Sequence, residues 1–211
     1  MHWQTDDADQ RHLVPDDVVD VAFAIACRTL PVEHAWDLWQ ALRAVVPWLV
    51  DEPGAGVHPL HVADSAHGWV RPDRPDDLLH PSRRTRLIVR VPRHRVPDTE
   101  LLSGRVLAIA GHERTLAGAS VRPLRDLTTL YARYVVAREM PDEQAFLEHA
   151  IAELRRLAIE PKKMLCGIER TIRTPEGAFH TRSLMLADLS VAESVRLQQT
   201  GLGPLRHLGC G

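Results

Sequence analysis

The sequence has only three cysteines, Cys27, Cys166 and Cys210, which are too few and too scattered for a disulfide framework or a zinc site. It also lacks an apolar run of the roughly 18–20 residues that a membrane helix needs. The longest apolar-leaning segment, residues 35–50, is interrupted by polar side chains and by Pro47. The first residues are acidic and have no apolar centre, so no secretory signal peptide is expected. These absences favour a cytoplasmic protein.

Net charge is nearly absent as well, since 26 basic and 28 acidic side chains leave a formal charge of −2. The charges are nevertheless segregated along the chain. Six aspartates precede Val21, residues 82–96 contain six arginines and no acid, and residues 155–182 contain seven basic residues against three glutamates. RNA binding needs a local basic face rather than a basic protein. The two basic clusters are therefore candidate RNA contacts, and ordinary solvated surface charge is the alternative.

Hydrophobic periodicity predicts the elements of the first half. A buried strand is expected over 18–26, because the run VVDVAFAIA is apolar and β-branched. The stripe of apolar residues between 35 and 49 predicts a long amphipathic helix, with Pro31 in its first turn and residues 53–56 ending it. Strands are expected over 57–62, 85–91, 105–109 and 114–122, and a short helix over 97–102.

The second half repeats this order loosely. We expect a strand over 130–137, a helix over 143–157, a hairpin of strands over 164–172 and 178–186, and a last helix over 191–200. Ser190 and Glu193 form a capping box in the sequence, and Gly201 follows as a helix-ending glycine. The predicted fold is α+β, with two tandem ferredoxin-like (βαββαβ) halves at 18–123 and 124–211 behind an acidic tail at 1–17. A last strand would be expected after Gly211.

The C-terminal stretch GLGPLRHLGCG carries the most specific motif. Its glycines Gly201, Gly203, Gly209 and Gly211 permit positive φ and close backbone approach, and their N–H groups could bind an anion beside Arg206 and His207. A dinucleotide fingerprint would need glycine at 206 and a preceding strand, and a phosphate loop would need Lys and Ser or Thr. Both of those interpretations fail, while a flexible tail after a helix cap remains the structural alternative.

The order G-x-G, basic residue, G-x-G after a last helix resembles the glycine loop of the repeat-associated RNA-binding CRISPR proteins. The segments EHAWDLWQAL (33–42) and GVHPL (56–60) resemble the branch of repeat-cleaving endoribonucleases, the Cas six family, in a variant type I form. The resemblance covers residues 18–211.

The resemblance implies two ferredoxin-like halves that bind a CRISPR repeat hairpin in a cleft. It also implies cofactor-free, metal-independent cleavage of the precursor RNA, in which a 2′-OH attacks the scissile phosphate and leaves a 2′,3′-cyclic phosphate on each guide RNA. Other Cas proteins of a surveillance complex are the implied partners.

Such a reaction needs a proton acceptor and a proton donor near neutral pH, which histidine provides. His34 is expected at the start of the first helix, where the helix dipole favours the neutral ring. His58 follows a glycine-rich turn at a place where relatives often keep a catalytic histidine. Both are candidate catalytic residues, and a structural role is the alternative for each. A metal site from His58, His61 and Asp64 lacks a supporting motif, so no metal is expected.

For RNA contact the strongest candidate is the hairpin at 164–186, which the family uses to reach the repeat stem. Duplex RNA is read mostly through phosphate and 2′-OH contacts, which arginine serves well. The expected cationic contacts are Arg83, Arg84, Arg86, Lys162, Lys163, Arg170, Arg173 and Arg182.

Two other functions remain open. A non-catalytic RNA-binding subunit would carry the same glycine loop. A phosphoesterase would need paired H-x-[ST] motifs, which the chain does not supply.

Overall fold

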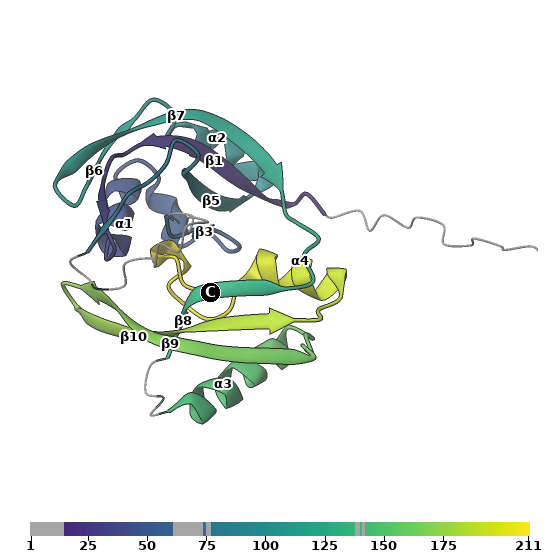
Figure 1. Ribbon diagram of the computed structural model, residues 1–211. Coiled ribbons are helices and arrows are strands. Elements are labelled where there is room, and N and C mark those ends of the chain that lie inside the picture. Colours follow the sequence, from purple (N-terminus) through teal and green to yellow (C-terminus); the bar gives the residue numbers. More distant parts are fainter. Residues whose placement is uncertain (1–14, 61–73, 75–76, 138–139, 141) are drawn as a thin grey trace, which may run out of the picture.

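The computed structural model describes residues 15–60, 74, 77–137, 140 and 142–211, which form two larger antiparallel sheets and a short two-stranded one, with helices between and outside the larger two (Figure 1). The first sheet has the strand order β3-β5-β1-β7-β6. Its strands are β1 (Val18–Ala26), β3 (Gly56–Val57), β5 (Arg86–Pro92), β6 (Val106–Ile109) and β7 (His112–Pro123). The helices of this half are α1 (Ala35–Arg43) and α2 (Val96–Glu100), with 3-10 turns at η1 (Pro47–Val50) and η2 (Arg93–Arg95).

Alternation of side chains fixes which face of this sheet is buried. In β1, Val19, Val21 and Phe23 are almost completely buried, and in β5 Leu87, Val89 and Val91 are fully buried. Asp20 and Arg90 lie between these residues and are paired in register, so they share the opposite face. The predicted strands at 18–26 and 85–91 are confirmed within one residue.

The first helix is shorter than predicted. It starts at Ala35 and ends at Arg43, and Pro47 opens the separate turn η1. Proline has no N–H to bond the carbonyl of residue i−4 and its ring clashes there, so the helix cannot run on to residue 50. Pro31 also lies outside the helix, in the two-residue strand β2 (Leu30–Pro31), which pairs with β4 (Leu78–Leu79). Residues 61 and 62 of the predicted strand 57–62 lie outside the described residues.

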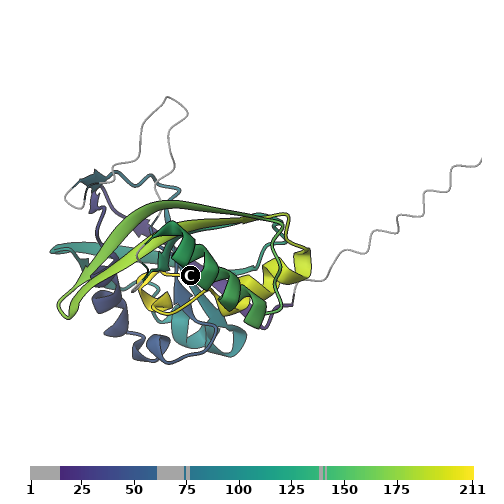
Figure 2. The ribbon, with the colours of Figure 1, turned by 90° about the horizontal axis from the view of Figure 1, so that it is seen from below.

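The second sheet has the order β8-β10-β9, from β8 (Leu130–Val136), β9 (Lys163–Thr174) and β10 (Gly177–Ala187). Helix α3 (Glu143–Arg156) begins where the Asp142 carboxylate accepts the Ala145 N–H, and it buries Phe146, Ala150 and Leu154. Helix α4 (Val191–Thr200) begins with the predicted capping box of Ser190 and Glu193. Helix α3 covers the side of this sheet turned away from the first sheet (Figures 1 and 2).

The chain ends between the two sheets (Figure 1). The 3-10 turn η3 (Arg206–Leu208) contacts both β3 and α1, and the Gly211 N–H donates to the Tyr134 carbonyl at 2.8 Å. The main hydrophobic core accordingly includes Tyr134, Ile172 and Leu208 of the second half beside β1, β5 and α1. The two halves are therefore joined by a shared core. No helix in the described part of the chain is long and apolar enough to cross a membrane.

Candidate active site and RNA interface

His34 is the N-cap residue of α1 and is only 4% exposed. Its Nδ1 lies 2.8 Å from the Pro31 carbonyl oxygen and 3.1 Å from that of Val32. Carbonyl oxygens only accept hydrogen bonds, so Nδ1 must carry the proton. In the neutral ring the lone pair is then on Nε2, which makes that atom the proton acceptor. The β2–α1 connection thus selects one tautomer of the predicted catalytic histidine.

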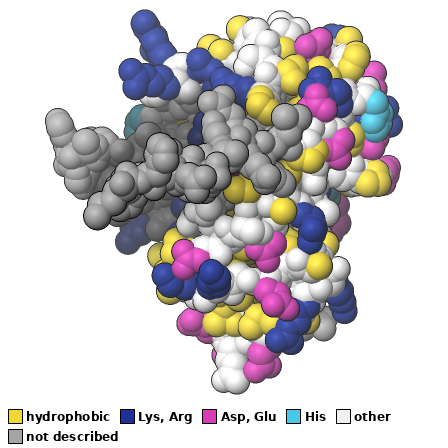
Figure 3. Space-filling view, turned by 90° about the vertical axis from the view of Figure 1, so that its right-hand side faces the viewer, with side chains coloured by type: hydrophobic (Ala, Val, Ile, Leu, Met, Phe, Trp, Pro, Cys, Tyr) yellow, Lys and Arg dark blue, Asp and Glu magenta, His cyan; other side chains and the backbone are white. Residues whose placement is uncertain are grey.

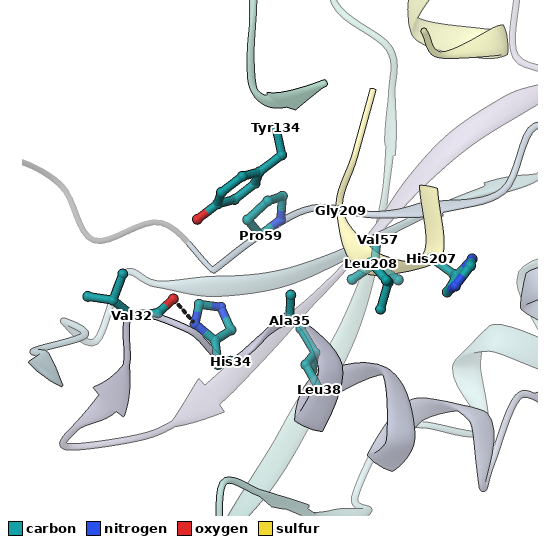
Figure 4. A pocket seen from close by; sticks show the side chains of 10 residues that line it. All are labelled: Val32, His34, Ala35, Leu38, Val57, Pro59, Tyr134, His207, Leu208 and Gly209. Atoms are coloured by element: carbon teal, nitrogen blue, oxygen red, sulfur yellow. Dashed lines mark hydrogen bonds between the residues drawn. The ribbon is translucent and has the colours of Figure 1, made fainter. Parts of the chain in front are cut away.

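A small pocket extends from His34 between the two halves. Figure 4 shows the His34 ring on one side, Tyr134 and Pro59 above it, and His207 at the far end. The Tyr134 hydroxyl accepts a hydrogen bond from Arg133 Nε at 3.2 Å, so its own hydrogen is available for another acceptor. His207 stacks at an angle on Trp39, with ring centroids 4.8 Å apart, and burial lowers its pKa. The pocket therefore joins the imidazole of His34, at the start of α1, to the phenol of Tyr134 in β8.

His58 belongs to a different cluster. Its Nε2 lies 3.6 Å from an Asp20 carboxylate oxygen, and Arg90 donates to both oxygens of Asp20 at 2.8 and 3.0 Å. Burial by itself would raise the pKa of Asp20. The contact with His58 and the hydrogen bonds from Arg90, together with their charges, outweigh burial and hold that pKa well below its usual range.

The two predicted catalytic histidines do not line one cavity. Val57 and Pro59 line the pocket of His34, whereas His58 between them contacts Asp20 on the opposite face of the first sheet. Successive side chains of an extended segment point to opposite faces. The pairing of β3 with β5 continues to His58, whose N–H donates to the Ile88 carbonyl at 2.9 Å, so the segment stays extended there.

The glycine loop packs around Arg206. A Cβ on Gly201, where φ is +72°, would lie 2.5 Å from Arg206 Nε, and a Cβ on Gly56 would lie 3.4 Å from it. The Arg206 guanidinium donates to the Gln199 carbonyl at 3.3 Å, and among the described residues it has no carboxylate partner. Burial, with a smaller effect of the Arg90 charge, lowers its pKa to about 10.

Most of the loop is packed rather than open. Leu202, Leu208 and Cys210 are buried, and the N–H groups of residues 201 and 208–211 donate to carbonyls of the protein. Gly209 leaves room for Pro59, and Gly211 lies against the backbone of Leu202. Gly203, at φ +81°, is exposed with nothing near its missing side chain. The positive φ values and close approaches agree with the sequence argument. Three of the four glycine N–H groups that it offered to an anion, those of Gly201, Gly209 and Gly211, are engaged within the protein.

The predicted cationic contacts are spread over the molecule. Arg83 and Arg84 are exposed, while Arg86 donates to the carbonyls of Arg83 and Thr85. Lys163, at the start of β9, lies about 33 Å from Arg173 at about 3.3 Å per residue, and Lys162 directly precedes the strand.

Three of these cations are paired with carboxylates, and Arg170 donates to the carbonyl of Ile168 at 3.3 Å. The pairs are Lys163 with Asp188 at 3.0 Å, Arg173 with Glu33 at 2.9 Å and Arg182 with Glu169 at 3.2 Å. On the side of the molecule shown in Figure 3, basic and acidic side chains are interspersed.

Three site residues were not singled out from the sequence. Tyr134 lies in the strand expected over 130–137, Asp20 in the acidic segment and Glu33 in the first helix. Their roles depend on contacts across 38, 70 and 140 positions of sequence, such as Asp20 with Arg90, which no local pattern reveals.

No group of three His, Cys, Asp or Glu side chains that could hold a metal ion occurs within the described ranges. His61 and Asp64, which completed the metal site considered from the sequence, lie outside those ranges.

Comparison with known proteins identifies the family. A family model described as Cas6 Crispr matches residues 19–211. The CRISPR-associated endonuclease Cas6 of Myxococcus xanthus is 30% identical over 193 residues, which are 92% of this chain and 79% of that protein. Two solved structures share the fold over 92% of this chain. One is a CRISPR associated protein Cas6, with a TM-score of 0.59, 10% identity and 97% of its chain covered. The other comes from a Cas6-related gene of Pyrococcus furiosus, with a TM-score of 0.60, 12% identity and 96% of its chain covered. The chain belongs to the Cas6 family.

Proposed function

We propose that this protein is a metal-independent endoribonuclease that cuts CRISPR repeat RNA in the cytoplasm and yields guide RNAs with a 2′,3′-cyclic phosphate. Membership of the Cas6 family supports activity as a CRISPR-associated endonuclease. The main support for the metal-independent mechanism is the tautomer of His34. Its Nε2 is the basic nitrogen in a pocket between the two halves.

In the proposed reaction His34 Nε2 accepts the proton of the ribose 2′-OH. The freed oxygen attacks the neighbouring phosphorus, the O2′–P bond forms and the P–O5′ bond breaks. The leaving 5′-oxygen takes up a proton from solvent and ends as a free 5′-OH, and the protonated His34 returns its proton to solvent. The Tyr134 hydroxyl would donate a hydrogen bond to a phosphate oxygen as negative charge builds up. These steps require no metal ion.

His58 is the second candidate for proton transfer. Its side chain is 36% exposed, and its Nε2 lies 3.6 Å from an Asp20 carboxylate oxygen. For His58 to act on the same phosphate as His34, the RNA would have to pass over the β3 edge of the first sheet. The tests below therefore treat the two histidines separately.

We also infer that the halves at 18–123 and 124–211 are tandem ferredoxin-like units. In the first half, β3-β5-β1-β7 corresponds to the ferredoxin-like order 2-3-1-4, with β6 added at the edge. In the second half, β8-β10-β9 corresponds to 1-3-2, and the segment ending at Gly211 reaches β8 in place of a fourth strand. The RNA would then bind along the junction of the halves, near Arg170 and the pocket of His34, and the product complex could join other Cas proteins.

The test is to incubate the purified protein with its cognate repeat RNA in excess EDTA. A single cut that ends in a cyclic phosphate is expected. His34→Asn keeps a donor for the Pro31 carbonyl but removes Nε2, so cutting should fall by about 100-fold or more while RNA binding is retained. His34→Ala and His58→Ala complete the set. If His34→Asn and His58→Ala both cut at the wild-type rate, the catalytic proposal is wrong.

The alternative is a subunit that binds the repeat RNA without cutting it. The observation in its favour is the burial of His34, of which only 4% is exposed. Tight RNA binding with no cut in any condition, with or without divalent metal, would support this second function.

A further inference from the structure

Glu33 joins the β9–β10 hairpin to the start of α1. Its Oε1 accepts the backbone N–H of Arg173 at 2.7 Å, and its Oε2 accepts from Arg173 Nη1 at 2.9 Å. One carboxylate therefore holds both the backbone and the side chain of a residue 140 positions away. The Glu33 side chain is 19% exposed and that of Arg173 is 64% exposed, so the carboxylate is the better enclosed partner.

The backbone bond to Glu33 also occupies the open edge of the second sheet. Among the described residues β9 is an edge strand that pairs with β10 alone, so alternate N–H groups of β9 point away from the sheet. The Arg173 N–H is one of these outward groups, and Glu33 supplies its acceptor. Since Ile172 beside it is 2% exposed and belongs to the main core, the hairpin is held there by packing and by this carboxylate.

The same contact borders the proposed active site. Glu33 directly precedes His34, whose carbonyl accepts the first helical hydrogen bond of α1, from Leu38, at 2.9 Å. A second hollow, lined by Glu33, Arg170 and Arg173, shares Val32, Ala35 and Tyr134 with the pocket of His34. The position of the hairpin relative to His34 Nε2 therefore depends on the Glu33–Arg173 pair.

We propose that Glu33 is a positioning residue for RNA cleavage: it fixes the β9–β10 hairpin, and the RNA segment that lies against it, at the distance from His34 that in-line attack needs. This inference rests on the proposed function. It also changes the role expected for Arg173. With its charge balanced by Glu33, Arg173 orients the hairpin and adds little to phosphate affinity.

The proposal predicts opposite effects on binding and cutting. Replacing Glu33 by Gln removes a negative charge from a surface that faces RNA, so affinity for the repeat should stay the same or increase. The hairpin would lose its ionic anchor, and a displacement of about 1 Å can slow a positioned reaction by about 100-fold. A general loss of folding would instead weaken binding and cutting together.

The experiment measures single-turnover cutting and RNA affinity for the wild type, Glu33→Gln, Arg173→Gln and the double variant. Asp37→Asn is the matched control, because it removes the same charge one turn further along α1, where Asp37 has no ion pair with a described residue. We expect Glu33→Gln to cut at least about tenfold more slowly with unchanged or tighter binding. Asp37→Asn should cut like the wild type, and the double variant should be no slower than Glu33→Gln. Normal cutting by Glu33→Gln, or equal slowing by Asp37→Asn, would overturn the proposal.

Hydrogen exchange separates this proposal from the proposed function. In Glu33→Ala the Arg173 amide loses its acceptor and should exchange at least about tenfold faster, whereas the amides of α3 should be unaffected. If the wild-type protein cuts no repeat RNA, the proposed function fails. Unchanged protection of the Arg173 amide would show that Glu33 does not hold the hairpin, and the positioning role would fail by itself.

Discussion

The N–H of Gly211 lies 2.8 Å from the carbonyl oxygen of Tyr134, so the glycine loop ends on the free edge of β8. This bond fixes the backbone of the residue whose ring forms one wall of the His34 pocket. Gly211 has φ +93° and leaves no room for a side chain against Leu202. The glycine loop and the proposed active site are thus one packed unit.

Replacing Tyr134 by Phe tests whether the hydroxyl contributes to the reaction. The ring and its packing remain, so the free energy of unfolding should fall by only about 1 kcal/mol for the lost bond to Arg133. Cutting should slow by about 100-fold if the hydroxyl stabilises the developing charge. Single-turnover cutting and urea unfolding measure the two effects, and cutting at the wild-type rate would remove Tyr134 from the mechanism.

Alanine at two glycines of the loop separates backbone strain from steric conflict. Gly203→Ala introduces only an unfavourable positive φ, which should lower the free energy of unfolding by about 1–2 kcal/mol. Gly201→Ala also has an unfavourable positive φ, with ψ 178°, and places Cβ 2.5 Å from Arg206 Nε, so it should lose about a further 1–3 kcal/mol. Thermal or urea unfolding gives both values.

Arg206→Ala in the Gly201→Ala background is the control for this pair. It removes the colliding side chain, so part of the loss caused by Gly201→Ala should be recovered. No recovery, or equal losses at residues 201 and 203, would mean that Arg206 does not determine the need for glycine at residue 201.

The Asp20 cluster predicts how stability depends on pH. Because the folded-state pKa of Asp20 is depressed, its ion pairs stabilise the protein above the unfolded-state pKa of about 3.9 and are lost as pH falls below it. Asp20→Asn should therefore be less stable than the wild type by about 2–3 kcal/mol at pH 7, and the difference should shrink toward pH 2. Urea unfolding across this range measures it. Asp16→Asn, at an exposed ion pair with Arg93, should show a much smaller difference.

Local sequence patterns were sufficient for most elements of the fold. The β1 and β5 strands, the capping box of α4 and the helix-ending Gly201 depend on residues within a few positions of one another, and these predictions were correct. The apolar stripe predicts a first helix that is longer than the observed one. Pro47 lies within this stripe, and its missing N–H ends the helix before residue 50.

The candidate site could be predicted only in part. His34 and His58 are candidates because few residue types suit proton transfer at neutral pH, and their catalytic role stays a prediction. The two histidines lie on opposite faces of the first sheet at its β3 edge. This placement depends on the pairing of β3 with β5. The contacts of Tyr134 with the His34 pocket and of Glu33 with Arg173 join the two halves, and only the folded chain brings them together.

The dispersed cations give a prediction for RNA affinity. Arg83 and Arg84 are exposed and have no ion pair with a described residue. They directly precede β5, at the end of the first sheet where Arg86 pairs with Ala24. If both contact phosphates, replacing both by Ala should weaken repeat RNA binding, and the slope of log affinity against log salt should fall by about 1.4–2. The matched control is the double variant Arg105→Ala and Arg122→Ala, at two exposed arginines outside both basic clusters, which removes the same charge. Titration of labelled repeat RNA between low and high salt measures both slopes. An equal change in both double variants would indicate a general effect of net charge and would exclude Arg83 and Arg84 as specific phosphate contacts.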